Sequence, residues 1–117
     1  MPIRRAQTVA KQARERIDSI HEEIVRIECL CSGTMLKRTK MCGRPDCACA
    51  TDPSARHGPY FEWGYMRGGR LAHRQVPPEH AAALVKAIAN YRRVKKLLRE
   101  WEVQTERLID AEQKPQA

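Results

Sequence analysis

The fold of this chain is decided by a short cysteine-rich stretch near its middle. The stretch runs Cys42-Gly43-Arg44-Pro45-Asp46-Cys47-Ala48-Cys49 and is followed, within the same region, by His57-Gly58-Pro59-Tyr60. Three thiols and an imidazole thus occur with the spacing C-x4-C-x-C-x7-H. Zinc takes four such ligands tetrahedrally, and Gly43 and Pro45 allow the chain to curl so that they converge. The sequence therefore predicts a Zn²⁺ site formed by Cys42, Cys47, Cys49 and His57.

Four protein ligands leave no open coordination position, so the predicted zinc is structural rather than catalytic. The alternative is three unrelated cysteines in a loop, although a reduced surface cluster without a metal would be prone to oxidation. The remaining two cysteines allow several interpretations. Cys31 suits a small buried hydrophobe on a helix, and Cys29 is a spare ligand, a reactive thiol or an inert half-exposed cysteine.

Composition favours a basic protein with a thin core. The 117 residues include 22 Lys and Arg against 14 Asp and Glu, a formal charge of +8, and only 5% are aromatic. Such a charge makes polyanions the leading partners, and a small core usually needs a metal or a partner chain. No uncharged run is long enough to span a membrane, so we expect a cytoplasmic protein with no membrane partner. An odd number of cysteines, 5, then favours metal ligation over disulfides.

Two segments that flank the centre carry heptad patterns, which are typical of helices that pair in a coiled coil. In residues 1–32 the apolar or small positions are Ala10, Ala13, Ile17, Ile20, Ile24, Ile27 and Cys31. In residues 78–117 they are Ala81, Leu84, Ile88, Tyr91, Val94, Leu98, Trp101, Thr105 and Leu108. We expect the first helix to end at Ser32-Gly33 and the second to fray over Lys114-Pro115-Gln116-Ala117.

Residues 33–77 predict strands. The candidate strands are Thr34–Met41, Tyr60–Met66 and Arg70–Val76, and the last two flank Gly68-Gly69, which suits a tight hairpin turn. The sequence thus predicts an α+β fold in one structural domain. Long N- and C-terminal helices (1–32 and 78–117), in a coiled-coil-like pair, flank a small zinc-bound three-stranded antiparallel sheet (33–77). The helices can pair within one chain or between two, and the apolar surface left over predicts a homodimer or a hetero-complex.

Several motifs together resemble a known family. They are Cys42-Gly43 with Cys47 and Cys49, His57-Gly58-Pro59-Tyr60, Gly68-Gly69, Val76-Pro77 and Asn90-Tyr91-Arg92-Arg93. The chain resembles a bacterial family of small proteins of unknown function that are often encoded beside transposases and integrases of mobile elements. The resemblance implies a zinc-knuckle-like site at the four ligands above and a mobile-element context. It brings no catalytic residues, and Cys29 and Cys31 are not part of it.

Three groups of cations could contact a phosphate backbone. The main candidates surround the first cysteine and the hairpin: Lys37, Arg38, Lys40, Arg44, Arg67, Arg70, His73 and Arg74. A secondary group on the last helix comprises Arg92, Arg93, Lys95, Lys96 and Arg99, which are equally explained as its solvated face. A two-stranded ribbon fits the major groove of DNA. Phe61, Trp63 or Tyr65 could instead stack on unpaired bases, although they also suit the core.

The sequence predicts no enzyme, because it lacks a Gly-rich phosphate loop, a G-x-S-x-G motif and paired carboxylates beside histidines. The leading hypothesis is a zinc-stabilised nucleic-acid-binding accessory protein of a mobile element, which binds DNA or RNA. The alternative is a protein-interaction adaptor whose helices dimerise or recruit a recombinase, a transposase or another partner.

Overall fold

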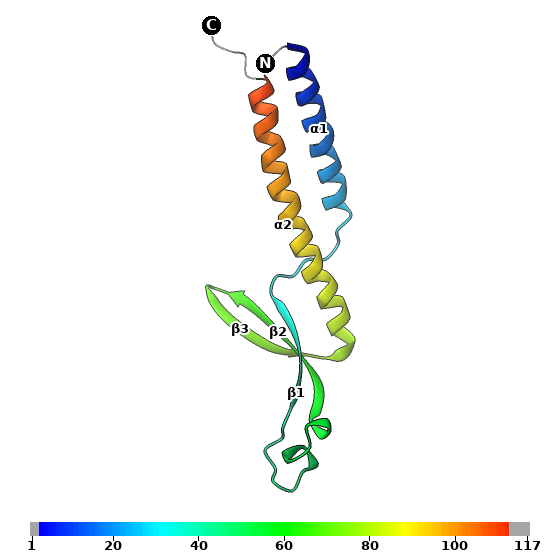
Figure 1. Ribbon diagram of the computed structural model, residues 1–117, viewed down its shortest axis with the longest axis vertical. Coiled ribbons are helices and arrows are strands. Elements are labelled where there is room, and N and C mark those ends of the chain that lie inside the picture. The colour runs from blue at the N-terminus through cyan, green and yellow to red at the C-terminus, as the bar shows by residue number, and fades with distance from the viewer. Residues whose placement is uncertain (1–2, 113–117) are drawn as a thin grey trace. The chain divides into compact units, whose positions relative to one another are not determined.

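The computed structural model describes residues 3–112, so the predicted frayed tail lies outside the described residues. The elements are α1 (Ile3–Val25), β1 (Thr34–Lys40), the short 3-10 turns η1 (Ala48–Ala50) and η2 (Pro53–Ala55), β2 (His57–Arg67), β3 (Arg70–Val76) and α2 (Pro78–Glu112) (Figure 1). The sheet is antiparallel with the order β1-β2-β3. The predicted α+β class, with two helices and a three-stranded antiparallel sheet, is confirmed.

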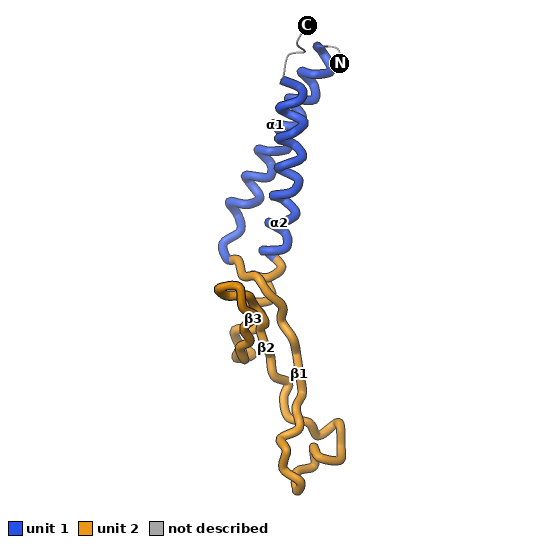
Figure 2. The backbone as a smooth tube through the Cα atoms, turned by 90° about the vertical axis from the view of Figure 1, so that its left-hand side faces the viewer, with its two compact units in different colours: residues 1–29, 90–117 blue, residues 30–89 orange. Residues whose placement is uncertain are grey.

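The chain divides into two compact units (Figure 2). We call residues 1–29 with 90–117 the helical unit, and residues 30–89 the sheet unit. The helix α2 contributes to both, since its first residues belong to the sheet unit and the rest to the helical unit. Whether the two behave as one structural domain stays a prediction.

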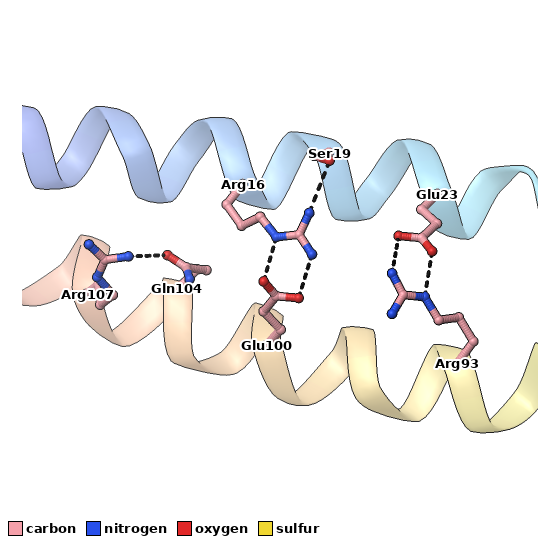
Figure 3. Close-up of polar contacts among 7 residues, drawn as sticks. All are labelled: Arg16, Ser19, Glu23, Arg93, Glu100, Gln104 and Arg107. Atoms are coloured by element: carbon pink, nitrogen blue, oxygen red, sulfur yellow. Dashed lines mark hydrogen bonds and ion pairs between the residues drawn. The ribbon is translucent and has the colours of Figure 1, made fainter.

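In the helical unit α1 and α2 run antiparallel and bury small and aliphatic side chains. Ala10, Ala13 and Ile20 of α1 are buried, as the heptad pattern predicts, and Leu97 of α2 is fully buried. Two bidentate ion pairs join the helices, as Figure 3 shows. Arg16 donates to both carboxylate oxygens of Glu100 at 2.5 and 2.6 Å, and Arg93 donates to those of Glu23 at 2.6 and 2.9 Å.

In the helical unit, the buried line of α2 residues is shifted by one position from the predicted line at two places, with Leu97 in place of Leu98 and Gln104 in place of Thr105. We expected Leu98, but Leu98 is 45% exposed whereas its neighbour Leu97 has no exposed surface. Six buried or half-buried residues at heptad steps form an inner seam, which we define as Val94, Leu97, Trp101, Gln104, Leu108 and Ala111. Its steps of three and four residues keep these side chains on one side of the helix. The prediction that Leu98 lies on the buried seam of the helix pair is therefore wrong.

The first helix is shorter than predicted: it ends at Val25 rather than at Ser32-Gly33. Its last turn tightens, because Arg26 and Ile27 donate their N–H groups to carbonyls three residues earlier. Beyond it, the carbonyl of Cys29 accepts from Asn90 Nδ2 at 3.0 Å, and the N–H of Cys31 donates to the carbonyl of Ala87 at 3.2 Å. Since α2 supplies these backbone partners, the segment needs no further helical turn.

The sheet unit depends on glycines at two close turns. Gly68 and Gly69 both have positive φ angles, 58° and 76°, which match the tight hairpin predicted between β2 and β3. Gly33, with φ 112°, precedes β1 and approaches β2 closely. A Cβ atom at Gly33 would overlap the carbonyl oxygen of Gly64 and lie 2.7 Å from Trp63 Nε1. The indole nitrogen donates to the carbonyl of Ser32 at 2.9 Å, so this crossing tolerates no side chain.

Candidate metal centre and cationic sheet face

The four predicted ligands lie on different local elements that converge beyond the ends of β1 and β2. Cys42 follows β1, Cys47 and Cys49 lie before and within η1, and His57 begins β2. The chain curls between them because Cys47 donates its N–H to the carbonyl of Arg44 at 3.2 Å and Ala50 donates to that of Cys47 at 3.0 Å. Antiparallel pairing of β1 with β2 then brings His57 opposite Lys40 and hence beside Cys42.

The ligand atoms of this cluster all lie within 4.8 Å of one another. Cys42 Sγ lies 3.5 Å from Cys49 Sγ, and Cys47 Sγ lies 3.4 Å from His57 Nε2. Around a tetrahedral ion with metal–sulfur bonds of about 2.3 Å, two sulfurs would be separated by roughly 3.8 Å. Cys42, Cys47, Cys49 and His57 therefore lie close together, as predicted, and could hold a metal ion.

The thiols of the cluster influence each other's protonation. Hydrogen bonds from the backbone N–H and thiol of Cys49, and from the Cys42 thiol, lower the pKa of Cys47. At Cys49 the N–H of Cys42 lies 3.4 Å from the sulfur and acts to lower its pKa, but burial and the two neighbouring thiols outweigh this effect and raise it. Three thiolates this close together would repel one another. A bound cation would offset that repulsion and favour their ionised forms.

A second turn orders the segment between Cys49 and His57. Asp52 Oδ1 accepts hydrogen bonds from the hydroxyl of Ser54 at 2.7 Å and from its N–H at 3.0 Å, which lowers the pKa of the carboxyl. This carboxylate caps η2 and is not part of the cluster. Sequence reasoning missed the cap, although an aspartate immediately before Pro53 is its usual signal.

Neither of the other two cysteines joins the cluster within the described residues 3–112. Cys29 is exposed and Cys31 is half-buried. The expected place of Cys31 on a helix is wrong, because α1 ends before it. The structure thus leaves no role for Cys29 as a spare ligand of this site.

Strand register separates the predicted cations into distinct locations. Residues opposite one another in adjacent strands share a face, and Phe61, Trp63 and Tyr65 lie opposite Val76, Arg74 and Ala72. We call the side of the sheet that carries these aromatic residues the aromatic face. Strand alternation adds four of the predicted cations to it: Lys37, Arg67, Arg70 and Arg74. Arg38 and His73 lie on the opposite face, with Glu62.

Two of the predicted cations, Arg38 and Lys40, form ion pairs with Glu62. This partner was not predicted from the sequence. Glu62 pairs with Lys40 Nζ at 2.9 Å and with Arg38 Nη1 at 3.5 Å. The hydrogen bond from Lys40, followed by the charges of Lys40, Arg38 and His73, lowers the pKa of Glu62 against the effect of burial. Lys40 also lies 5.4 Å from the centre of the Tyr60 ring. Arg38 and Lys40 therefore share one carboxylate, so the three side chains together carry a net charge of +1 instead of the +2 of the two cations alone.

The aromatic face combines half-buried rings with exposed guanidinium groups. The rings of Trp63 and Tyr65 are tilted against each other with centres 4.1 Å apart. Arg74 lies 5.3 Å from the centre of the Trp63 ring, and Arg67 lies 5.0 Å from that of Tyr65. Such cation–π contacts hold the guanidinium groups in place while their edges remain free to donate hydrogen bonds. Val76 is buried, so the end of this face near Phe61 belongs to the core.

An open hollow of about 790 Å³ lies beside the cysteine cluster. Its lining comprises Lys40, Met41, Cys42, Arg44, Asp46, Cys47, His57, Tyr60 and Gln75. Arg44 is exposed there, which places this predicted cation next to the candidate metal centre rather than on the aromatic face. The secondary group on α2 is also divided, since Arg93 is engaged by Glu23 and Lys95 lies 5.6 Å from the centre of the Tyr91 ring.

These features define a small α+β protein that carries a cluster of three thiols and one imidazole beside a three-stranded antiparallel sheet. Residues 10–86 match the family described as "Domain of unknown function (DUF6788)". The match covers more than half of the chain, and the protein therefore belongs to that family. No curated protein and no solved structure matches it. Among the described residues, neither helix is long and apolar enough to cross a bilayer.

Proposed function

We propose that this protein is a zinc-stabilised nucleic-acid-binding accessory protein. The observation that carries the proposal is the aromatic face, where Lys37, Arg67, Arg70 and Arg74 lie on the same side of the sheet as Trp63 and Tyr65. Guanidinium groups donate to phosphate oxygens, and aromatic rings beside them offer stacking surfaces for unpaired bases. DNA and RNA share both features, and the mobile-element setting rests on the family resemblance alone.

The proposed zinc ion has a structural role. Between Met41 and Arg56 the only buried side chain is that of Cys49, so burial contributes little to the stability of this segment. A Zn²⁺ ion bound by Cys42, Cys47, Cys49 and His57 would crosslink the segment to the start of β2 and supply folding free energy directly. It would thereby hold the β1–β2 end of the sheet that supports the aromatic face.

The proposal limits the predicted phosphate-binding residues to cations on the aromatic face that form no ion pair with another described residue. Arg38 and Lys40 are paired with Glu62, and His73 lies on the face opposite the aromatic residues. Arg70 and Arg74 are exposed and make no ion pair among the residues that the structure describes. These two arginines, beside the Gly68-Gly69 turn, are the strongest candidates for phosphate contacts.

The α1–α2 pair supports the finer proposal of a coiled-coil-like arrangement. The inner seam of α2 and the buried positions Ala10, Ala13 and Ile20 of α1 both follow heptad steps. The antiparallel ion pairs Arg16–Glu100 and Glu23–Arg93 flank this seam, as charged positions do in coiled coils.

The experiment compares salt dependence between two matched double variants. Fluorescence anisotropy with labelled single-stranded and duplex DNA and RNA would be measured between about 50 and 200 mM salt. If Arg70 and Arg74 contact phosphates, Arg70→Gln/Arg74→Gln should reduce the slope of log K against log salt by roughly two units for duplex DNA. The control Arg92→Gln/Lys96→Gln removes the same charge from α2 and should keep the wild-type slope. Circular dichroism verifies folding.

Two outcomes would contradict the proposal. A control variant that loses the slope while the hairpin variant keeps it would place the binding site on α2. A wild-type protein that binds no nucleic acid at low salt would overturn the function and favour the adaptor alternative.

A further inference from the structure

The helix α2 carries a second line of residues at heptad steps, most of which remain exposed beside α1. This outer seam consists of Tyr91, Lys95, Leu98, Glu102, Thr105 and Ile109. Leu98 and Ile109 are 45% and 56% exposed, Lys95 and Glu102 are also exposed, and Tyr91 and Thr105 are half-buried. A helix with two adjacent heptad seams is typically packed on two sides, and only one of them is accounted for by α1.

A hollow of about 500 Å³ lies on the outer seam. It is lined by Leu98, Trp101, Glu102, Thr105 and Glu106. Trp101 belongs to both sides of the helix, because its ring contacts that of His21 edge-on, with centres 4.3 Å apart, and also lines the hollow. The surface therefore combines apolar side chains that can be buried with a depression that can receive a partner's side chain.

Positive and negative side chains along the outer seam are separated into two groups. Towards its N-terminal end lie Lys95 and Arg99, and towards its C-terminal end lie Glu102 and Glu106. None of these four side chains forms an ion pair with another described residue. By contrast, Arg93 and Glu100, on the side of α2 towards α1, are both paired. The outer seam thus has a basic half and an acidic half, both unneutralised.

We propose that the outer seam is the interface with a second copy of this chain, bound through antiparallel packing of α2 against α2. A two-fold axis near residue 100 would place the basic half of one copy opposite the acidic half of the other, and Leu98 of each copy in the central contact. The same patch then serves both copies, as a two-fold interface requires. A parallel arrangement would oppose Lys95 to Lys95 and Glu102 to Glu102, and like charges would disfavour it.

A second copy fits this surface better than a partner of uniform charge. An acidic partner would complement Lys95 and Arg99 but repel Glu102 and Glu106, and a basic partner would do the reverse. Only a partner with the inverse charge order satisfies both halves, and an antiparallel copy of α2 has that order. The proposal is independent of nucleic-acid binding, because it involves none of the cations on the aromatic face.

Charge reversal provides a test that distinguishes this interface from simple loss of stability. Sedimentation equilibrium of the full chain, from about 1 to 100 µM, should show a reversible dimer for the wild type. Lys95→Glu/Arg99→Glu makes the seam wholly acidic, and Glu102→Lys/Glu106→Lys makes it wholly basic. Each variant alone should be monomeric, whereas an equimolar mixture of the two should form a heterodimer. The fourfold variant that combines all these changes should dimerise again.

A matched control and two outcomes complete the test. The control Lys96→Glu/Arg107→Glu lowers the net charge as much as Lys95→Glu/Arg99→Glu does. It does so on another side of α2 and should leave the dimer intact. A wild type that remains monomeric at 100 µM would overturn the proposal and assign the outer seam to a different partner. Dimers that persist in both single-sign variants, or a mixture that fails to associate while each variant is folded by circular dichroism, would also overturn it.

Discussion

The helical unit and the cysteine-rich end of the sheet unit are held together by different means. In the helical unit two helices bury Ala13, Ile20 and Leu97 completely, and bidentate ion pairs flank this contact. In residues 41–56 Cys49 alone is buried, and the chain follows turns rather than long helices or strands. The comparison teaches that burial can explain the first region, whereas the second has little burial and instead brings four side chains together that could hold a metal ion.

The largest expected effect comes from disrupting the cluster. Structural zinc supplies roughly 10 kcal/mol or more in small zinc-binding modules, so Cys49→Ala or a chelator should unfold residues 41–56. Hydrogen exchange should show protection lost there and retained in the helical unit. Elemental analysis of the purified wild type should find one zinc per chain. Cys29→Ala is the matched control, since Cys29 lies outside the cluster and should be replaceable without effect.

This prediction has a clear contrary result. If freshly reduced protein, prepared without chelator, contains no zinc, the prediction of a structural zinc ion is contradicted. A Cys49→Ala variant with unchanged exchange in residues 41–56 would show that local turns suffice to order the segment.

A smaller effect is expected from the helical core. Leu97→Ala removes a fully buried side chain and should lower the free energy of unfolding by about 2–5 kcal/mol. Leu98→Ala, one residue later, removes a largely exposed side chain and should cost less than about 1 kcal/mol. Urea denaturation at low protein concentration measures both. Equal effects of the two substitutions would contradict the assignment of Leu97 to the inner seam.

Gly33 offers a third perturbation, at the entry to the sheet. Gly33→Ala should destabilise the sheet unit by about 1–3 kcal/mol, because alanine disfavours the φ angle of 112° and its Cβ would overlap the Gly64 carbonyl. Gly69→Ala is a useful comparison: Gly69 also has positive φ, but a Cβ there meets no atom within 4 Å. Thermal unfolding should therefore show the larger loss at Gly33, and equal losses would exclude a role for the close approach.

The smallest expected effect concerns the ion pair between Arg16 and Glu100. The hydrogen bond from Arg16 lowers the pKa of Glu100 from its ordinary value of 4.5. A carboxyl with a lowered pKa stabilises the fold above its ordinary pKa, and this contribution is lost as pH falls through the folded-state value. The stability difference between wild type and Glu100→Gln should thus be constant above about pH 5.5 and shrink at lower pH. Urea denaturation at several pH values measures it.

The double variant Arg16→Gln/Glu100→Gln serves as the reference for that experiment. It should have the same pH profile as Glu100→Gln if the two side chains act as a pair. A difference between wild type and Glu100→Gln that persists unchanged to pH 3 would contradict the role of this ion pair.

Features determined by neighbouring residues could be predicted from the sequence. The convergence of Cys42, Cys47 and Cys49 follows from their short separation, and the hairpin follows from Gly68-Gly69 between two strand patterns. The α+β class followed from heptad steps on either side of these strands. In each of these cases the deciding signal lies within a few residues of the feature that it specifies.

Features determined by distant partners could not be predicted. Beyond the end of α1 at Val25, the Cys31 N–H donates to the Ala87 carbonyl and the Asn90 side chain donates to the Cys29 carbonyl, and no nearby residue in the sequence indicates these partners. Leu97 and Leu98 are the same type of residue, and only the position of α1 decides which of the two side chains is buried. The pairing of Arg38 and Lys40 with Glu62 depends on the register of β1 against β2. Sequence alone therefore overestimated the free positive charge near the cluster.

The placement of the two tryptophans has a spectroscopic consequence. The chain contains 2 tryptophans, and one lies in each unit: Trp63 in the sheet unit and Trp101 in the helical unit. Each indole is half-buried, so unfolding of its own unit would expose it to water and change its emission. Trp63→Phe and Trp101→Phe therefore give two single-fluorophore proteins, each of which reports on one unit. Intrinsic fluorescence can in this way resolve whether the two units unfold together or in sequence, without any attached label.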